Sequence, residues 1–323
     1  MRLAIIIVNF RTPELTADCL RSLADQIESQ PTQVVVVDNH SGDDSVRYLG
    51  ETIEDNSWQS WVTLLPQSLN RGYAAGNNAA LRPLLESEHP PDVVWLLNPD
   101  CIVEPDSLSA LLGFLRTHPE AALAGSRLLD RDGEPQRSAF RFHTLLSELD
   151  DALRWRVVSR LAQSHVVAPP APDRACRTDW VAGASLIVRR EVFERIGLLD
   201  EGYFLYFEDV DFCLRARRAG FECWYAPESR VIHLVGSSTG VTDPSKATAR
   251  RPSYWFQARH RYFRRNFGAL YTVAADLVFL AGFVVWRLRR AIQGKPDGDP
   301  ARFLGDFLRH SIFHLGSRHS LHS

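Results

Sequence analysis

The sequence predicts an α/β fold built on a doubly wound, mostly parallel sheet, with a helical extension at the C-terminus. Three observations predict it: short β-branched runs such as Leu3–Val8, helical patterns between these runs, and an apolar, arginine-rich last quarter. Continuous apolar runs are typical of strands buried on both faces of a parallel sheet. Ligands of such sheets bind beyond the carboxyl ends of the strands, so polar residues at those ends are the first candidates for a site.

Strand and helix patterns alternate through the first 130 residues. Thr12 and Pro13 form a start signal for a helix, and the apolar residues after them recur at helical spacing. The expected strands are 3–8, 34–37, 61–65, 93–97 and 121–125, and the expected helices are 13–28, 43–54, 76–85 and 106–117. This order is typical of βαβ units, which join parallel strands.

The pattern changes after Asp132. The expected segments are then an exposed helical insertion at 142–161, an extended proline-rich linker at 166–173, a glycine-containing strand at 180–189, an apolar segment at 269–286 and an amphipathic stretch at 303–315.

Composition excludes several classes of protein. The chain has 323 residues and a formal charge of only -2, and it shows no long basic block before its last third, so a general nucleic-acid binder is disfavoured. Five scattered cysteines without a Cys-x-x-Cys pair disfavour a disulfide framework and a structural zinc site, which favours a reducing cytosol. Asn9, Arg11 and Pro13 end the first apolar run before a signal-peptide core forms.

Three carboxylates, Glu208, Asp209 and Asp211, follow an aromatic run that begins at Tyr203. Charged carboxylates beside apolar rings need a metal, a cation or a reacting proton as compensation. The structural alternative is that Asp209 caps a helix in which Asp211 and Arg215 form an i,i+4 pair.

Asp100 follows the apolar run 93–97 and the Asn-Pro pair after it. A carboxylate at this position can bind a hard divalent cation, whose other ligands would include diphosphate oxygens. His233 follows another predicted strand and precedes the Gly-Ser-Ser-Thr turn at 236–239, which could donate hydrogen bonds to a phosphate. Its imidazole could complete a metal shell. The structural alternatives are that Asp100 is an acid of a turn and that His233 is a histidine of the core.

A nucleotide site is indicated by two further polar segments. Asp38 and Asn39 follow the second strand, and the polar turn that contains Asn70, Arg71, Gly72 and Asn77 enters a helix. The structural alternatives are that Asp38 only caps a turn and that the polar turn around Asn70 is a simple loop. The first strand-to-helix turn, 8–13, has no glycine, so it cannot form the Gly-x-Gly-x-x-Gly loop of a dinucleotide-binding dehydrogenase.

Taken in order, these motifs resemble the family 2 inverting glycosyltransferases of GT-A fold, and particularly the rhamnosyltransferase-like branch. The resemblance covers residues 3–240 and departs from the common Asp-x-Asp metal motif, because Asn98 occupies the first acidic position. The motifs are Ile7-Val8-Asn9, Val37-Asp38-Asn39, Asn70-Arg71-Gly72, Asn98-Pro99-Asp100, Gly183-Ala184, Phe207 to Asp211, and His233.

The resemblance implies transfer of a sugar, such as L-rhamnose from dTDP-rhamnose, from a nucleotide diphosphate to a surface-polysaccharide or polyprenyl-linked saccharide acceptor. Asp209 would be the general base, and Glu208 and Asp211 would support it or shape the acceptor site. Trp180 and Tyr206 are candidate sugar-stacking rings or core residues. Mg²⁺ or Mn²⁺ would bind Asp100 and His233. The nucleotide-sugar would contact Asn9, Asp38, Asn39, Asn70, Arg71, Gly72, Asn77 and Asp100.

The implied domains are a catalytic region at 1–245, with a nucleotide-sugar half to about 130 and an acceptor half after it, and a helical C-terminal region at 246–323. Asp276 interrupts the apolar segment 269–286, and arginines flank both of its ends. The segment could lie on an anionic cytoplasmic membrane surface, form a buried hairpin or span the bilayer. Two other functions stay open: a sugar-1-phosphate nucleotidyltransferase and a catalytically silent membrane-assembly scaffold.

Overall fold

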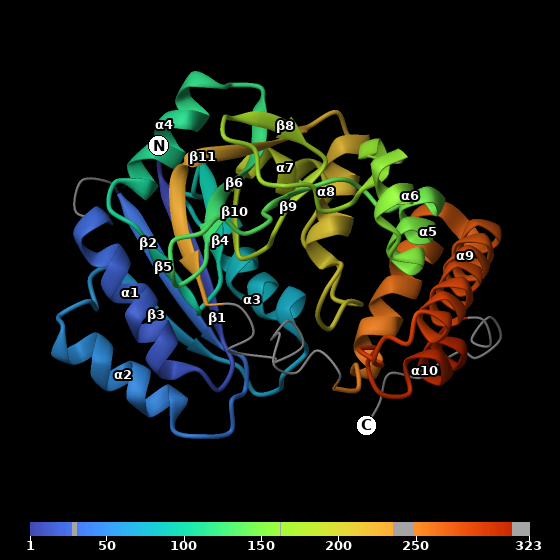
Figure 1. The fold of residues 1–323 in the computed structure, drawn as a ribbon. Coiled ribbons are helices and arrows are strands. Elements are labelled where there is room, and N and C mark those ends of the chain that lie inside the picture. Colours follow the sequence, from blue (N-terminus) through green and yellow to red (C-terminus); the bar gives the residue numbers. More distant parts are fainter. Residues whose placement is uncertain (28–30, 162, 235–248, 312–323) are drawn as a thin grey trace. The chain divides into compact units, whose positions relative to one another are not determined.

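The computed structural model describes residues 1–27, 31–161, 163–234 and 249–311, and it divides into two compact units (Figure 1). Unit 1 comprises Met1–Phe142, Ala168–Phe204 and Glu208–Gly240, and unit 2 comprises His143–Val167, Leu205–Phe207 and Val241–Ser323. The predicted turn at 236–239, Glu28 and the end of the amphipathic stretch lie outside the described residues.

Unit 1 contains a nine-stranded sheet with the order β3-β2-β1-β4-β10-β6-β11-β5, and β8 pairs with β11 off this path. Neighbours among β3, β2, β1 and β4 are parallel, as are β6 and β11, whereas β10, β5 and β8 run antiparallel to their partners. The predicted doubly wound, mostly parallel sheet is confirmed. The strands are β1 (Leu3–Asn9), β2 (Thr32–Asp38), β3 (Val62–Pro66), β4 (Val93–Leu97), β5 (Cys101–Val103), β6 (Ala121–Leu129), β8 (Cys176–Thr178), β10 (Ser185–Arg189) and β11 (Glu222–His233).

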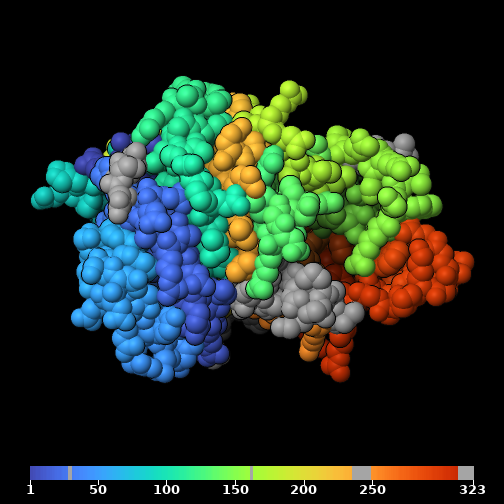
Figure 2. All heavy atoms as spheres, turned by 60° about the vertical axis from the view of Figure 1, so that its left-hand side comes forward, coloured from blue at the N-terminus to red at the C-terminus, as the bar shows by residue number. Residues whose placement is uncertain are grey.

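Helices cover both faces of this sheet. Ile5 and Ile7 pack in one core with Leu20 of α1, while Val8 faces the opposite side and lies against Gly76 of α3. Figure 2 shows α1 and α2, in two shades of blue, side by side on the surface. The helices of unit 1 are α1 (Pro13–Ile27), α2 (Ser45–Asp55), α3 (Tyr73–Leu85), α4 (Ser107–Thr117), α7 (Arg190–Ile196) and α8 (Glu208–Arg218).

Two sequence expectations for strands were incomplete. The expected strand 180–189 is divided into β9 (Trp180–Val181) and β10, because the chain turns at Ala182 to Ala184, and β9 pairs with β7 (Ala139–Phe140) in a second sheet. Strand β5 has only three residues and was not predicted, since its pairing with β11 is a long-range contact.

The expected helical insertion at 142–161 is helical, but its expected exposure is wrong for α5. It forms α5 (Leu145–Leu153) and α6 (Arg156–Leu161) in unit 2, and α5 buries Glu148, Asp150 and Ala152. Glu148 pairs with the buried Arg259, whose Nη2 lies 2.6 Å from Oε2, so polar residues that suggested exposure are paired inside the unit.

Unit 2 also contains α9 (Ser253–Ile292) and α10 (Phe303–His310). Helix α9 is interrupted at Gly268, where φ is 85° and ψ is 175°. A straight helix would separate Arg259 and Asp276 by about 26 Å, yet their side chains form a buried ion pair, so the two arms fold back on each other. Within the described residues, α9 is the single helix with the length and apolar composition to cross a membrane, which is weak evidence alone.

Candidate active site

Asp209 lies in the first turn of α8 and is only half-buried. Its Oδ2 accepts a hydrogen bond from the backbone N–H of Gly183 at 3.0 Å, and its Oδ1 accepts one from Val210 N at 2.8 Å. A helix N-terminus favours a negative charge because its first N–H groups have no partner within the helix. The carboxylate is therefore held in a fixed orientation with access to solvent.

The turn that carries Gly183 also holds the Asp100 segment. The Ala184 carbonyl accepts from Asn98 N at 3.0 Å and from the Cys101 thiol at 3.4 Å. Ser185 is the register partner of Leu97, the last residue of β4. Asp100 and Asp209 therefore lie at the same end of the sheet, the carboxyl end of β4, where a doubly wound fold binds its ligand.

Glu208 differs from its neighbour because it is buried, and among the described residues its Oε2 has no hydrogen-bond partner. Burial, and then the negative charge of Asp209, raise the pKa of Glu208 well above its usual range. The raised pKa disfavours a second negative charge beside Asp209, the more accessible of the two carboxylates.

Asp211 is fully buried. It accepts a hydrogen bond from Tyr203 Oη at 3.2 Å, and its Oδ2 lies 2.8 Å from Arg215 Nε, which confirms the i,i+4 pair foreseen as the structural alternative. Arg215 also donates to the carbonyls of Ile196 and Leu198, so this pair anchors α8 to the preceding loop.

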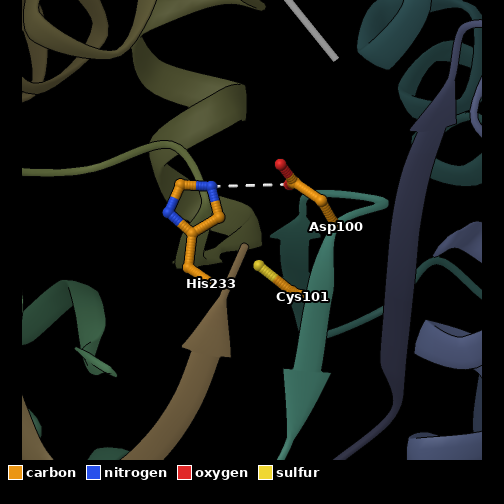
Figure 3. Close-up of side chains that lie close together, drawn as sticks. All are labelled: Asp100, Cys101 and His233. Atoms are coloured by element: carbon orange, nitrogen blue, oxygen red, sulfur yellow. Dashed lines mark ion pairs between the residues drawn. The ribbon is translucent and has the colours of Figure 1, made fainter. Parts of the chain in front are cut away.

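Asp100, Cys101 and His233 form a candidate metal centre, with one ligand atom from each residue lying within 4.8 Å of the others. Figure 3 shows the Asp100 carboxylate and the His233 ring facing each other, with 3.4 Å between Oδ1 and Nε2. Cys101 and His233 are register partners in the β5–β11 pair, so a pairing absent from sequence reasoning brings this set together.

The donor types fit a hard divalent cation. Burial, and then the charge of Asp100, raise the pKa of the Cys101 thiol well above its usual range, which disfavours the thiolate form that binds metals. Asp100 and His233 supply one oxygen and one nitrogen, and Mg²⁺ or Mn²⁺ would take its remaining ligands from diphosphate oxygens and water.

Asn9 orients Asp38 from the ends of β1 and β2. Asn9 is fully buried and its Nδ2 donates to Asp38 Oδ1 at 2.7 Å. Ser41, which sequence reasoning missed, donates to Asp38 through its hydroxyl at 2.6 Å and its N–H at 3.1 Å. Asp38 is itself 2% exposed, so the two residues form a preorganised pair at the ends of β1 and β2.

Asn39 joins this pair to the polar turn before α3. Its Nδ2 donates to Asn70 Oδ1 and to the Gly72 carbonyl, each at 3.0 Å. Gly72 has a φ of 91°, and a Cβ there would lie 2.1 Å from the Phe204 carbonyl oxygen, so only glycine fits. Arg71 is exposed and pairs with Glu201, an acid that sequence reasoning missed, at 3.1 Å.

Other predicted residues lie elsewhere. Asn77 is fully buried within α3, where Nδ2 donates to the Tyr73 carbonyl. Trp180 is half-buried, and its ring stacks on Phe140 with 4.1 Å between centroids, so one of its faces is covered. Tyr206 belongs to unit 2, where it stacks on Tyr254.

Comparison with known protein families identifies the family of this chain. A family model described as "Glycosyltransferase like family 2" matches residues 1–268. The chain belongs to this glycosyltransferase family. The predicted family, fold and enzyme class are confirmed, and neither the nucleotidyltransferase nor the scaffold is favoured.

Proteins similar in sequence include the N-acetylglucosaminyl-diphospho-decaprenol L-rhamnosyltransferase of Mycobacterium tuberculosis. It is 29% identical over 266 residues, which cover 75% of this chain and 82% of the relative. The dTDP-rhamnosyl transferase RfbF of Shigella flexneri is 24% identical over 281 residues, which cover 85% of this chain and 84% of the relative.

Solved structures agree on the glycosyltransferase fold. The mannosyltransferase PcManGT from Pyrobaculum calidifontis, in complex with GDP-Man and Mn²⁺, superposes with a TM-score of 0.57 at 15% identity, covering 97% of this chain and 81% of its own. GalNAc-T7 with UDP, GalNAc and Mn²⁺ gives a TM-score of 0.57 at 14% identity, covering 96% and 58%. At these identities the likeness concerns the fold.

Proposed function

We propose that this glycosyltransferase moves L-rhamnose from dTDP-rhamnose to a surface-polysaccharide or polyprenyl-diphosphate-linked saccharide, with inversion at the anomeric carbon. The names of the relatives support the donor and the lipid-linked acceptor. The main structural support is the turn at Gly183 and Ala184. Gly183 donates a hydrogen bond to Asp209, and Ala184 accepts one from Asn98 in the segment that presents Asp100.

Asp209 acts in this proposal as the general base. A single displacement needs one base that takes the proton of the acceptor hydroxyl as that hydroxyl attacks the anomeric carbon. The raised pKa of Glu208 disfavours a second negative charge beside this base. Asp211, committed to Arg215, supports the base through α8.

The donor nucleotide would bind at the joined ends of β1, β2 and α3. Asp38, held by Asn9, would face the nucleoside, and Asn39, Asn70, Arg71 and Gly72 would close on it. Asn77 would support this wall from within α3. A divalent Mg²⁺ or Mn²⁺ held by Asp100 and His233 would neutralise the charge that develops on the leaving diphosphate.

We also propose a catalytic region at 1–245 and a C-terminal region at 246–323 that contacts the inner face of the cell membrane. The exposed side chains of the second arm of α9 are largely apolar and recur at helical spacing, with Leu270, Leu277, Val284, Leu288 and Ile292 on one side. The opposite side is packed: a Cβ at Gly282 would lie 2.9 Å from that of Ala152. Because one side of the helix packs against protein and the other is apolar and exposed, we expect the helix to lie at the membrane–water interface and not to span the bilayer.

The experiment that tests the function is a donor screen with the full chain, Mn²⁺ and saccharide acceptors. Nucleotide sugars are compared by the product released, and anomeric configuration is read by NMR. Release of dTDP from dTDP-rhamnose with an inverted product is the expected result. Pyrophosphate release, or turnover of another donor at a higher kcat/KM, contradicts the proposal.

A further inference from the structure

Unit 2 contains an open pocket of about 360 Å³, hereafter the cavity, within the range of about 300–1,000 Å³ typical of small-molecule sites. All of its lining residues belong to unit 2: they come from 143–154, from Phe207, from Arg251 just before α9, from both arms of α9 and from 298–303. The active-site residues assigned above, other than Tyr206, are in unit 1, so no role has been given to this cavity.

Arg251 is the most informative residue of the cavity wall. Its guanidinium lies over the Trp255 ring, 5.0 Å from the centroid, and it forms no hydrogen bond or ion pair within the part of the chain that the structure describes. Burial lowers the pKa of Arg251. A partly buried guanidinium with all of its donors available calls for an acceptor from a ligand.

Asp151 provides acceptors on the same cavity. It lines the cavity, burial raises its pKa to about 6, and it likewise forms no hydrogen bond or ion pair with another described residue. Arg251 and Asp151 do not pair with each other, so the cavity offers planar donors on one residue and planar acceptors on another.

The other charges of the wall are already matched. Arg259 pairs with Glu148 at 2.6 Å and with Asp276, and Arg154 pairs with Asp299 at 2.8 Å. Three arginines line the cavity, and four acids line it or stand directly behind these arginines, so the formal charges nearly balance. A strongly anionic ligand such as a diphosphate would find no excess of positive charge.

Aromatic side chains complete the wall, namely Phe207, Trp255, Phe279 and Phe303. Aromatic rings together with planar hydrogen-bonding groups match a sugar, which has apolar C–H faces and hydroxyls that both donate and accept. We infer that this cavity binds a neutral sugar residue of the acceptor saccharide. The inference rests on the proposed transferase function and adds a saccharide subsite in unit 2.

The test uses the full-length protein and direct binding. Saturation-transfer NMR measures binding of methyl glycosides of N-acetylglucosamine, rhamnose, mannose and galactose, without donor. At least one glycoside should bind, and Arg251→Gln and Asp151→Asn should each weaken it about tenfold. Arg264→Gln, on an exposed arginine of α9, is the control. Since Arg251 and Asp151 form no hydrogen bond with another described residue, these variants should fold, as thermal unfolding would verify.

Activity separates this inference from the proposed function. Donor hydrolysis without acceptor should be unchanged in both variants, while KM for the saccharide acceptor rises about tenfold with kcat nearly constant. Absence of glycoside binding, or binding that the two variants leave intact, overturns the saccharide subsite even if transfer is observed. Arg251-dependent binding of geranyl diphosphate in place of glycosides also overturns it, because it shows an anionic lipid site.

Discussion

The carboxylate of Asp209 accepts a hydrogen bond from the backbone N–H of Gly183, with 3.0 Å between Oδ2 and N. Because Ala184 then accepts from Asn98 N, one short turn fixes both the predicted base and the segment that presents Asp100. Rigid placement of this kind matters because proton transfer requires the base within hydrogen-bond reach of the acceptor hydroxyl.

Replacing Asp209 with asparagine should lower kcat by about 10²- to 10⁴-fold, the usual contribution of a general base. The amide oxygen can still accept from Gly183, so the fold and the affinity for dTDP should be retained. Steady-state rates and calorimetric titration with dTDP measure the two effects. Asp132→Asn, on an exposed acid of unit 1, serves as the control. Full activity in the Asp209→Asn enzyme would rule out the assigned base.

Removal of either proposed metal ligand should weaken Mn²⁺ binding by at least tenfold. Asp100→Asn and His233→Gln each delete one donor, and Mn²⁺ affinity in the presence of dTDP can be followed by electron paramagnetic resonance. Cys101→Ser is a matched control, since the protonated thiol donates to Ala184 and is not expected to bind the ion. Equal losses in all three variants would contradict the oxygen and nitrogen ligand set.

Glu208 should make stability depend on pH. Its folded-state pKa is raised, so between the ordinary glutamate pKa and the folded value the native protein binds more protons than the unfolded chain. The contribution of Glu208 to the free energy of unfolding therefore falls as pH rises through that window. Glu208→Gln should remove the term, so the variant gains stability over the wild type with rising pH. Urea unfolding from pH 5 to 8 measures this, with the exposed Glu120→Gln as control. A parallel pH dependence in both proteins would refute it.

Gly72 and Gly42 provide a matched pair for backbone strain. Both have positive φ, of 91° and 68°, but only at position 72 would a Cβ meet a backbone carbonyl, that of Phe204 at 2.1 Å. Gly42→Ala should cost about 1–2 kcal/mol for the left-handed conformation. Gly72→Ala should cost more than about 3 kcal/mol, because strain and collision combine. If urea unfolding gave similar losses of stability for Gly72→Ala and Gly42→Ala, the prediction would be wrong, because the backbone at Phe204 would then move aside at little cost.

Charges placed on the exposed side of α9 should release the protein from membranes. Leu277→Asp and Leu288→Asp each replace an exposed apolar residue, so flotation with phosphatidylglycerol vesicles should recover at least fivefold less of each variant. Leu69→Asp, at a residue 62% exposed in unit 1, is the control and should float like the wild type. Vesicle binding that survives both changes would argue against this face.

Local pattern was sufficient for much of the fold. Strand β4 was predicted with its observed limits, and α1 and α2 to within two residues, because unbroken apolar runs and helical spacing are properties of neighbouring residues. The ordered motifs also led to the correct family, since each polar motif follows a predicted strand or opens a predicted helix.

Other features depended on contacts between residues far apart in the chain. No local pattern pairs Cys101 with His233 or shows that burial raises the pKa of Glu208. Nor does any local pattern show that Arg259 pairs with Asp276 within the α9 hairpin. The amino-acid order by itself determined which segments become strands and helices and which side chains carry chemistry, because both follow from short-range sequence. Only the tertiary structure decided which carboxylate is buried with a raised pKa and which metal-binding side chains meet, because burial and electrostatic compensation arise when distant segments pack.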